Sequence, residues 1–347
     1  MEQVIITKHT IERNYLFDTL KGVGILLVIF GHLIEQMTTP TAEAIYKIIY
    51  IFHMPLFIVI SGYFARFNWE KILTHLLIPY LILQVIFTPI EFIALKPKLD
   101  ILFILRPKWL LWFLFALIIW KISLLLIDKL KKYLPIIIAV SFVVGLVFGF
   151  LKFDGFILSI SRLVVFYPFF LLGYHFKQNG FITKLGAINK WWKITLIALS
   201  FICFILIFVL FPHTPKNAFY GSLNYHQLPH YTIFFRLFNY IGATIITLTL
   251  LSITPKTKTH IAFFGKQSFT LYIGHAPFGM PIALLLAKLA TPYVVLLAFP
   301  LTELIVLIIL TARQLYIKYN PFKKHTSQNL LANTDSTPST CMEQKSK

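Results

Sequence analysis

Residues 17–32 read FDTLKGVGILLVIFGH, an apolar run that also holds Asp18, Lys21 and His32. A helix of about 20 apolar residues is long enough to cross a lipid bilayer. Lys21 and His32 are eleven positions apart. At ~100° per residue, their side chains therefore differ by only about 20° around the helix axis. Asp18 and Glu35 fall on the same stripe, within roughly 60° of His32. The sequence thus predicts a spanning helix with one ionisable face.

The cost of such a face and the composition of the chain indicate the same class of protein. A charge at mid-bilayer depth costs about 2.5–3.5 kcal/mol on an insertion scale, so the stripe should face other helices or water. Of the 347 residues, 58% are hydrophobic and 13% charged, and the mean hydropathy is +0.77. A soluble domain carries about 25% charged residues. We therefore predict an all-α fold, a polytopic transmembrane helical bundle, whose net charge of +19 reflects membrane topology rather than nucleic-acid binding.

Apolar stretches of about 17–25 residues, the length that a spanning helix needs, recur along the chain. Ten run over residues 16–34, 44–64, 72–95, 109–127, 135–151, 157–175, 194–211, 231–253, 268–288 and 292–312. Lysine and arginine are concentrated in the loops that share a side with the N-terminus, which predicts cytoplasmic termini. We accordingly predict a cytoplasmic N-terminal segment (1–15), a transmembrane domain (16–313) and a polar, disordered cytoplasmic tail (314–347). The basic segment 96–108 falls outside and is expected to be re-entrant or interfacial.

His32 is the first candidate for chemistry, because it lies near the outer end of the first predicted span. A histidine can take and return a proton near neutral pH, since its unperturbed pKa is about 6.5. Glu35, one turn further on, could orient the imidazole and select its tautomer. The alternative is a histidine that only packs, with its hydrogen bond made to a neighbouring carbonyl. The stripe shared with Lys21 favours the functional interpretation.

A group of basic residues is expected at the cytoplasmic end of the bundle. Asp18 and Lys21 are spaced for an i,i+3 ion pair. Lys21 could bind a phosphate that arrives from the cytoplasm, or the pair could simply anchor the helix. Further candidates for the same role are Arg66, Lys71 and His75, although ordinary positive-inside charge would account for these three as well.

Several other polar residues lie inside predicted spans. His53 is either a member of the site or a buried structural hydrogen-bonder, and Ser61-Gly62 permits close helix approach. Each ionisable residue in hydrocarbon needs a partner, and an ion pair of Glu303 with either arginine is the natural expectation. The arginines could instead extend outward to the interface. The candidates that line a site are His53, Ser61, Arg162, Arg236, Ser268, His275 and Glu303.

Two remaining features bear on partners and cofactors. The connection at 212–230 is rich in aromatic and hydrogen-bonding side chains, which suits either a sugar-contacting lid or an interfacial loop. The two cysteines, Cys203 and Cys341, have no metal-ligand spacing, so neither a disulfide nor a metal site is predicted.

Four stretches of the chain together carry a resemblance to a known family. They are FDTLKGVGILLVIFGH (17–32), YIFHMPLFIVISGYF (50–64), RPKWLLWFLFALIIW (106–120) and FGKQSFTLYIGHAPF (264–278). In order and spacing they resemble the acyltransferase-3 family of polytopic membrane O-acyltransferases, and within it the fucose 4-O-acetylase-like branch. The similarity covers about residues 13–315.

The resemblance extends to single residues. The family's basic residue, ten intervening positions and histidine map onto Lys21 and His32, and its preceding acidic residue onto Asp18. Its Ser-Gly maps onto Ser61 and Gly62, and its late serine and histidine onto Ser268 and His275. The pair of arginines that many members carry before a proline is absent, because only Lys71, His75 and Pro79 fit loosely.

The resemblance implies transfer of an acyl group, usually acetyl, from cytoplasmic acetyl-CoA to a hydroxyl of a surface polysaccharide or lipid-linked glycan. It also implies a multi-pass protein of the bacterial cytoplasmic membrane, with acyl-CoA as donor and no permanently bound cofactor. In this interpretation His32, with Glu35, is the base or transient acyl carrier, and the basic group binds donor phosphates. The rival hypothesis is a polysaccharide exporter or flippase without acyl transfer, because polar residues inside a bundle and an aromatic outer loop suit that function too.

Overall fold

The computed structural model describes residues 15–95, 101–289 and 293–319, and this part of the chain contains helices and loops but no strand. The first half comprises α1 (Leu16–Ile34), α2 (Pro40–Tyr50), α3 (His53–Tyr63), α4 (Trp69–Ile72), the π-helix η1 (Leu73–Leu77), α5 (Ile78–Leu95), α6 (Ile101–Leu105), η2 (Trp109–Leu111), α7 (Trp112–Ile127), η3 (Lys131–Tyr133), α8 (Leu134–Val147) and η4 (Phe148–Phe150). The second half comprises η5 (Ile157–Ser159), α9 (Ile160–Gln178), α10 (Phe181–Gly186), α11 (Lys190–Leu210), η6 (Lys216–Tyr220), α12 (Ile233–Ile253), α13 (Ile261–Lys266), α14 (Ser268–Gly274), α15 (Ala276–Leu289) and α16 (Val294–Tyr319).

The helices agree with the predicted number of membrane spans. Among the described residues, nine helical segments are long and apolar enough to cross a membrane. The pair Ser268–Gly279 and Pro281–Leu289, bent by 51°, makes a tenth if it is one span. The all-α fold and the prediction of about ten spans are therefore confirmed.

Some predicted boundaries change or lie outside the described residues. The helix α16 continues to Tyr319. The predicted tail is therefore helical at its start, because residues 314–319 extend the last span. Residues 1–14, 96–100 and 320–347 lie outside the described part, and with them almost all of the N-terminal segment, most of the tail and the beginning of the 96–108 segment.

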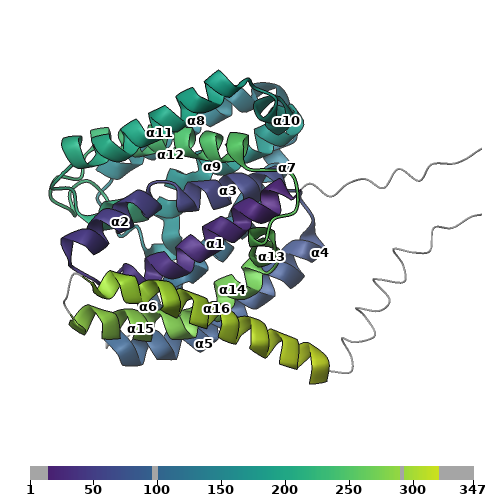
Figure 1. Cartoon of the computed structure of the whole chain (residues 1–347). Helices are drawn as coiled ribbons and strands as arrows, with labels where there is room; N and C mark the ends of the chain where they lie inside the picture. Colours follow the sequence, from purple (N-terminus) through teal and green to yellow (C-terminus); the bar gives the residue numbers. More distant parts are fainter. Residues whose placement is uncertain (1–14, 96–100, 290–292, 320–347) are drawn as a thin grey trace, which may run out of the picture.

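The first helix lies in the middle of the bundle (Figure 1). It packs against α2, α3 and α12 on one side and against α13, α14, α15 and α16 on the other. Most of its residues are buried, and these include Asp18. Neighbouring helices thus surround the ionisable stripe, as the cost of exposing it to lipid requires.

A crossing of α3 and α9 fixes the second span close to the core. A Cβ atom on Gly62 would lie 2.0 Å from the Phe170 carbonyl oxygen, and one on Gly173 would lie 1.9 Å from the Val59 carbonyl oxygen. Only glycine fits where two helix backbones approach this closely. The close approach expected of the Ser61-Gly62 pair is therefore present.

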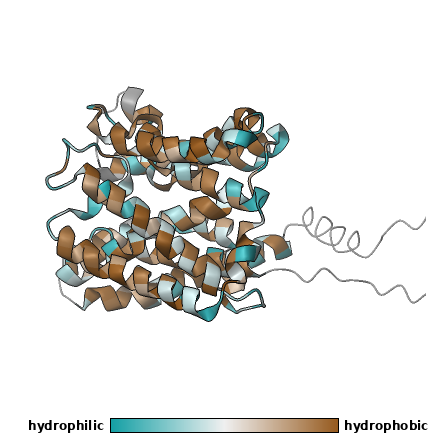
Figure 2. Ribbon diagram, turned by 90° about the horizontal axis from the view of Figure 1, so that it is seen from above, coloured by the Kyte–Doolittle hydropathy of each residue, from teal (hydrophilic) through white to brown (hydrophobic). Residues whose placement is uncertain are grey.

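The surface of the bundle separates into an apolar belt and two polar ends. Large apolar side chains such as Val85, Ile93 and Val209 are well exposed along the helices. Figure 2 shows hydrophobic residues along the lengths of the helices and hydrophilic segments at the two ends. The helix α1 begins and α16 ends at the same end of the bundle (Figure 1). The end of α1 lies at the opposite end, near the loop between α11 and α12.

Candidate active site

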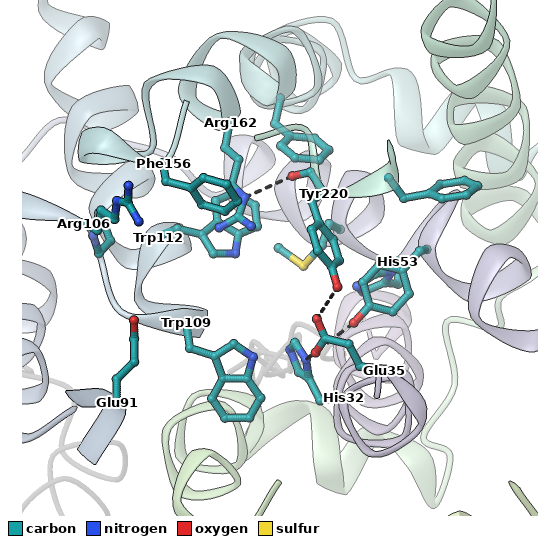
Figure 3. Close-up of a pocket in the computed structure, with 15 residues that line it drawn as sticks. His32, Glu35, His53, Glu91, Arg106, Trp109, Trp112, Phe156, Arg162 and Tyr220 are labelled. Atoms are coloured by element: carbon teal, nitrogen blue, oxygen red, sulfur yellow. Dashed lines mark hydrogen bonds and ion pairs between the residues drawn. The ribbon is translucent and has the colours of Figure 1, made fainter. Parts of the chain in front are cut away.

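A cavity of about 320 Å³ lies at the end of the bundle where α1 finishes. It is lined by residues of α1, α2, α3, α5, α7 and α9, and by the segments 106–109 and 216–220. Figure 3 shows the labelled charged side chains distributed around its wall, together with aromatic rings from several elements. Four of the predicted site residues line it, namely His32, Glu35, His53 and Arg162.

His32 and Glu35 form the predicted pair at the bottom of the view in Figure 3. The Nδ1 atom of His32 lies 2.9 Å from Oε2 of Glu35. The second carboxylate oxygen, Oε1, accepts a hydrogen bond of 2.6 Å from the Tyr220 hydroxyl. A carboxylate that accepts from Nδ1–H leaves the lone pair of the imidazole on Nε2. His32 is therefore arranged as a base.

The charge of Glu35 is stabilised by its neighbours. Burial by itself would raise the pKa of this carboxyl, but the hydrogen bond and charge of His32, the Tyr220 hydroxyl and the positive charge of Arg162 together lower the pKa below its ordinary value. Burial and the charge of Glu35 raise the pKa of Tyr220, so the phenol keeps its proton and donates it. Glu35 is thus an anion near neutral pH, as an orienting carboxylate must be.

The loop between α11 and α12 is fastened to the end of α1. Lys216 donates from Nζ to the carbonyl oxygens of Glu35 and Met37, the latter at 2.8 Å. Four residues further on, Tyr220 contacts the Glu35 carboxylate and lines the cavity. The aromatic connection that suited either a lid or an interfacial loop therefore forms part of the cavity wall.

Two more histidines lie beside His32 and share one hydrogen-bond pattern. Nδ1 of His53 lies 3.0 Å from the Ile49 carbonyl oxygen, and Nδ1 of His275 lies 3.0 Å from that of Leu271. Each ring therefore donates from Nδ1 and keeps Nε2 as an acceptor. The His275 ring stacks on His32 with centroids 5.5 Å apart, and its Nε2 is buried without a hydrogen-bond partner among the described residues.

Arg162 lies across the cavity from His32 (Figure 3). Its Nε donates to the Tyr220 carbonyl oxygen at 3.0 Å, and its guanidinium lies 5.0 Å from the centroid of Trp112. No ion pair to this guanidinium is found within the described ranges. The remaining donors of Arg162 are therefore available to a ligand.

Two candidates of the sequence are placed away from this cavity. Arg236 is buried and donates to the Tyr231 hydroxyl and to the carbonyl oxygens of Gly145 and Leu223. Glu303 is exposed on α16, and the structure of the described residues contains no ion pair between it and either arginine. The expected pairing is wrong because backbone carbonyls and a phenol already satisfy Arg236, while Glu303 faces outward.

A second cavity, of about 180 Å³, lies further along α1 towards its beginning. Lys21, Ser61 and Ser268 line it, and Met54 lines both this cavity and the one at His32. Nζ of Lys21 lies 3.0 Å from Oδ1 of Asp18, so the predicted i,i+3 ion pair is formed. The stripe on α1 thus connects two cavities.

The remaining basic candidates lie at the surface. Arg66, Lys71 and His75 are exposed and line neither cavity. The His75 ring is hydrogen-bonded to the Thr74 hydroxyl at 2.7 Å. These three residues are near the end of the bundle where α1 begins, which is where Lys21 also lies.

Tyr220, Trp109 and Tyr50 also belong to the site, although the sequence patterns did not predict them. Tyr220 fixes Glu35, the Trp109 ring lies 4.8 Å from that of His32, and Tyr50 lies beside both histidines of this wall. The aromatic connection 212–230 and the stretch RPKW (106–109) were the available signals. Neither stretch indicates which aromatic ring lies in the cavity wall, because that depends on contacts between distant segments.

Comparison with known proteins gives an independent result. A family model described as an acyltransferase domain matches residues 14–311. The chain is 30% identical over 223 residues to the nodulation protein NolL of Mesorhizobium japonicum, an alignment that covers 56% of this chain and 57% of that relative. It is 43% identical over 58 residues to NolL of Sinorhizobium fredii, covering 15% and 16% of the two chains. The chain thus spans just over half the length of the first of these relatives. No solved structure matches it significantly.

Proposed function

The chain belongs to the acyltransferase family whose domain matches residues 14–311, and on this premise we propose that it is an integral-membrane O-acyltransferase. It moves an acetyl or other short acyl group from a cytoplasmic acyl-CoA to a hydroxyl of a cell-surface glycan or its lipid-linked precursor. The single observation that carries the proposal is the His32–Glu35 pair, with Nε2 left as the base and a cavity in front of it. The membrane is the bacterial cytoplasmic membrane, in keeping with the bacterial relatives.

The transfer step follows from the geometry of the base. The acceptor hydroxyl gives its proton to Nε2 of His32 while its oxygen attacks the thioester carbonyl carbon. The carbon–sulfur bond then breaks, and the CoA thiolate leaves and takes up the proton. Alternatively Nε2 first accepts the acyl group and the hydroxyl removes it in a second step. Both routes yield an O-acyl glycan and free CoA.

The donor enters from the end where α1 begins. Lys21 and His32 are about 16 Å apart along a helix that rises 1.5 Å per residue. A pantetheine arm bridges such a distance, with the acyl group at His32 and the nucleotide at the inner end. Lys21, held by Asp18, supplies positive charge to the phosphates, together with Arg66, Lys71 and His75 at the surface. The second cavity and Met54 lie along this route.

The acceptor binds in the outer cavity. The faces of Trp112, Phe156 and Tyr220 suit the apolar face of a sugar ring, and the available donors of Arg162 suit its oxygen atoms. A glycan that lies between Arg162 and His32 presents a hydroxyl to Nε2. His53, with Nε2 as an acceptor in the same wall, binds a second hydroxyl.

The decisive experiment measures whether a radiolabelled acetyl group passes from acetyl-CoA to an oligosaccharide. Purified protein in nanodiscs is incubated with [14C]acetyl-CoA and an oligosaccharide panel, and O-acetylated product is identified by mass spectrometry. We expect transfer by the wild type and a loss of roughly 10²–10⁴-fold in His32→Ala. A wild-type protein that moves a lipid-linked sugar across liposomes without acetyl-CoA, and transfers no label, overturns the proposal in favour of a flippase.

A further inference from the structure

Trp109 has an unusual backbone conformation beside the candidate base. Its φ of 38° lies in the left-handed region, which side chains larger than that of glycine rarely adopt. Lys108 before it is extended, and Trp109 begins the short helix η2. Strain of this kind costs on the order of 1–3 kcal/mol, so it persists only where surrounding contacts impose it.

Three of the contacts on the segment before Trp109 come from one side chain on a different helix. Gln84 of α5 donates from Nε2 to the carbonyl oxygens of Ile104 and Arg106, at 3.2 and 2.8 Å. Its Oε1 accepts from the Lys108 amide at 3.0 Å. One glutamine thus makes three hydrogen bonds to the segment that precedes Trp109. These bonds fix the direction in which the chain enters η2.

The result is that the Trp109 ring lies against His32. The two ring centroids are 4.8 Å apart at an interplanar angle of 61°, and Figure 3 shows the indole and Glu35 on opposite sides of the imidazole. His275 stacks on the same imidazole at 5.5 Å. The His32 ring, which lines the cavity, is thus contacted by Glu35 at Nδ1, by Trp109 and by His275.

We propose that Trp109 is a positioning residue for His32 and that Gln84 holds Trp109 in place. The indole keeps Nε2 directed into the cavity. Its π-electrons also stabilise the imidazolium that forms when His32 takes the acceptor's proton, an interaction that strengthens where water is excluded. The inference rests on the proposed acyl transfer. It adds two residues to it, Trp109 in the cavity wall and Gln84 behind that wall.

The test compares aromatic and aliphatic replacements of Trp109 in the full-length protein in nanodiscs. We expect Trp109→Leu to lower kcat for acetyl transfer by about tenfold or more, with KM for acetyl-CoA unchanged. Trp109→Phe restores most of that kcat, because a smaller ring still faces the imidazolium. The matched control is Trp191→Leu, since Trp191 is 67% exposed on α11 and lines neither cavity.

The role of Gln84 is tested with two variants, one that removes only its hydrogen-bond donor and one that removes both its donor and its acceptor. Gln84→Glu loses the bonds to Ile104 and Arg106 but can still accept from Lys108, whereas Gln84→Met loses all three. We expect kcat to fall in the order wild type, Gln84→Glu, Gln84→Met, again at constant KM for acetyl-CoA. In the Trp109→Leu background, Gln84→Met should add little further loss, because both changes act through the same ring.

The outcomes separate this inference from the proposed function. If the wild-type protein transfers no acetyl group, the proposed function itself fails. If the wild type is active and Trp109→Leu keeps its kcat, or if Trp109→Phe is no better than Trp109→Leu, the positioning role is overturned. Should Trp109→Leu not fold, Trp109→Phe decides alone. A fall in kcat of about tenfold or more in Trp109→Leu at constant KM supports the proposal, and unchanged kcat with raised KM contradicts it.

Discussion

The hydroxyl of Tyr220 donates a 2.6 Å hydrogen bond to Oε1 of Glu35 across 185 positions of sequence. The same carboxylate accepts from His32 through its other oxygen. A loop between two late helices therefore completes the base at the end of the first helix. Both bonds lower the pKa of this buried carboxyl and so favour its charged form.

Removal of the Tyr220 hydroxyl should lower the rate of acetyl transfer without changing the KM for the acyl donor. In Tyr220→Phe the Glu35 carboxylate loses a hydrogen bond to a charged group, an interaction worth about 1.5–3 kcal/mol. We expect kcat for acetyl transfer to fall roughly tenfold or more, with KM for acetyl-CoA unchanged. Tyr293→Phe is the matched control, since that ring is 75% exposed. An unchanged kcat would show that Tyr220 does not support the base.

The acid stability of the protein should depend on Glu35. Its pKa is lower in the folded protein than the ordinary value of 4.5, so the unfolded chain binds more protons in this range. The stabilisation is therefore fully present above about pH 4.5 and is lost as the pH falls through the folded pKa. Thermal unfolding from pH 7 down to 3 should show this loss in the wild type and a smaller one in Glu35→Gln. Equal loss in both, with the exposed Glu70→Gln as control, contradicts the prediction.

Met54 should control passage between the two cavities, because it lines both. A larger side chain in Met54→Trp fills the space that a pantetheine arm needs. We expect acetyl transfer to fall by about tenfold or more, while Met54→Leu, a swap of similar volume, stays near the wild-type rate. Binding of adenosine 3′,5′-diphosphate, the nucleotide part of CoA without its pantetheine arm, should change little when measured in parallel. Normal transfer by Met54→Trp would place the donor elsewhere.

The crossing of α3 and α9 should tolerate no Cβ atom. In Gly62→Ala the new methyl group would lie 2.0 Å from the Phe170 carbonyl oxygen, so the two helices must separate. We expect a loss of about 1–3 kcal/mol in stability, seen as a lower Tm. Gly186→Ala serves as control, because a Cβ there meets only the flexible end of Lys256, at 3.6 Å. Equal Tm values for the two variants would contradict the close packing.

The sequence predicted those side-chain contacts whose two residues lie within or at the end of one helix. The His32–Glu35 and Asp18–Lys21 pairs follow from i,i+3 spacing alone, because helix geometry places such side chains together in any fold. The spans followed from length and hydropathy for the same reason. Their orientation in the membrane stays a prediction.

What could not be predicted depends on contacts between distant segments. The Tyr220 side chain and the Trp109 ring reach His32 and Glu35 only because a loop and a strained turn fold back over α1. Arg236 is the opposite case, a residue that was predicted in the site but lies outside it. It was expected there because it is a charge within a span. Its guanidinium instead donates hydrogen bonds to the carbonyls of Gly145 and Leu223 and to the Tyr231 phenol.

The attachment of Lys216 and Tyr220 to the end of α1 has a consequence for biosynthesis. The first helix leaves the ribosome early, but the carboxylate of Glu35 gains its second partner only after the chain has been made beyond residue 220. His275, which stacks on His32, arrives later still. A nascent or truncated chain thus carries the base without its supports. These supports are in place only once the segment that carries His275 has been synthesised.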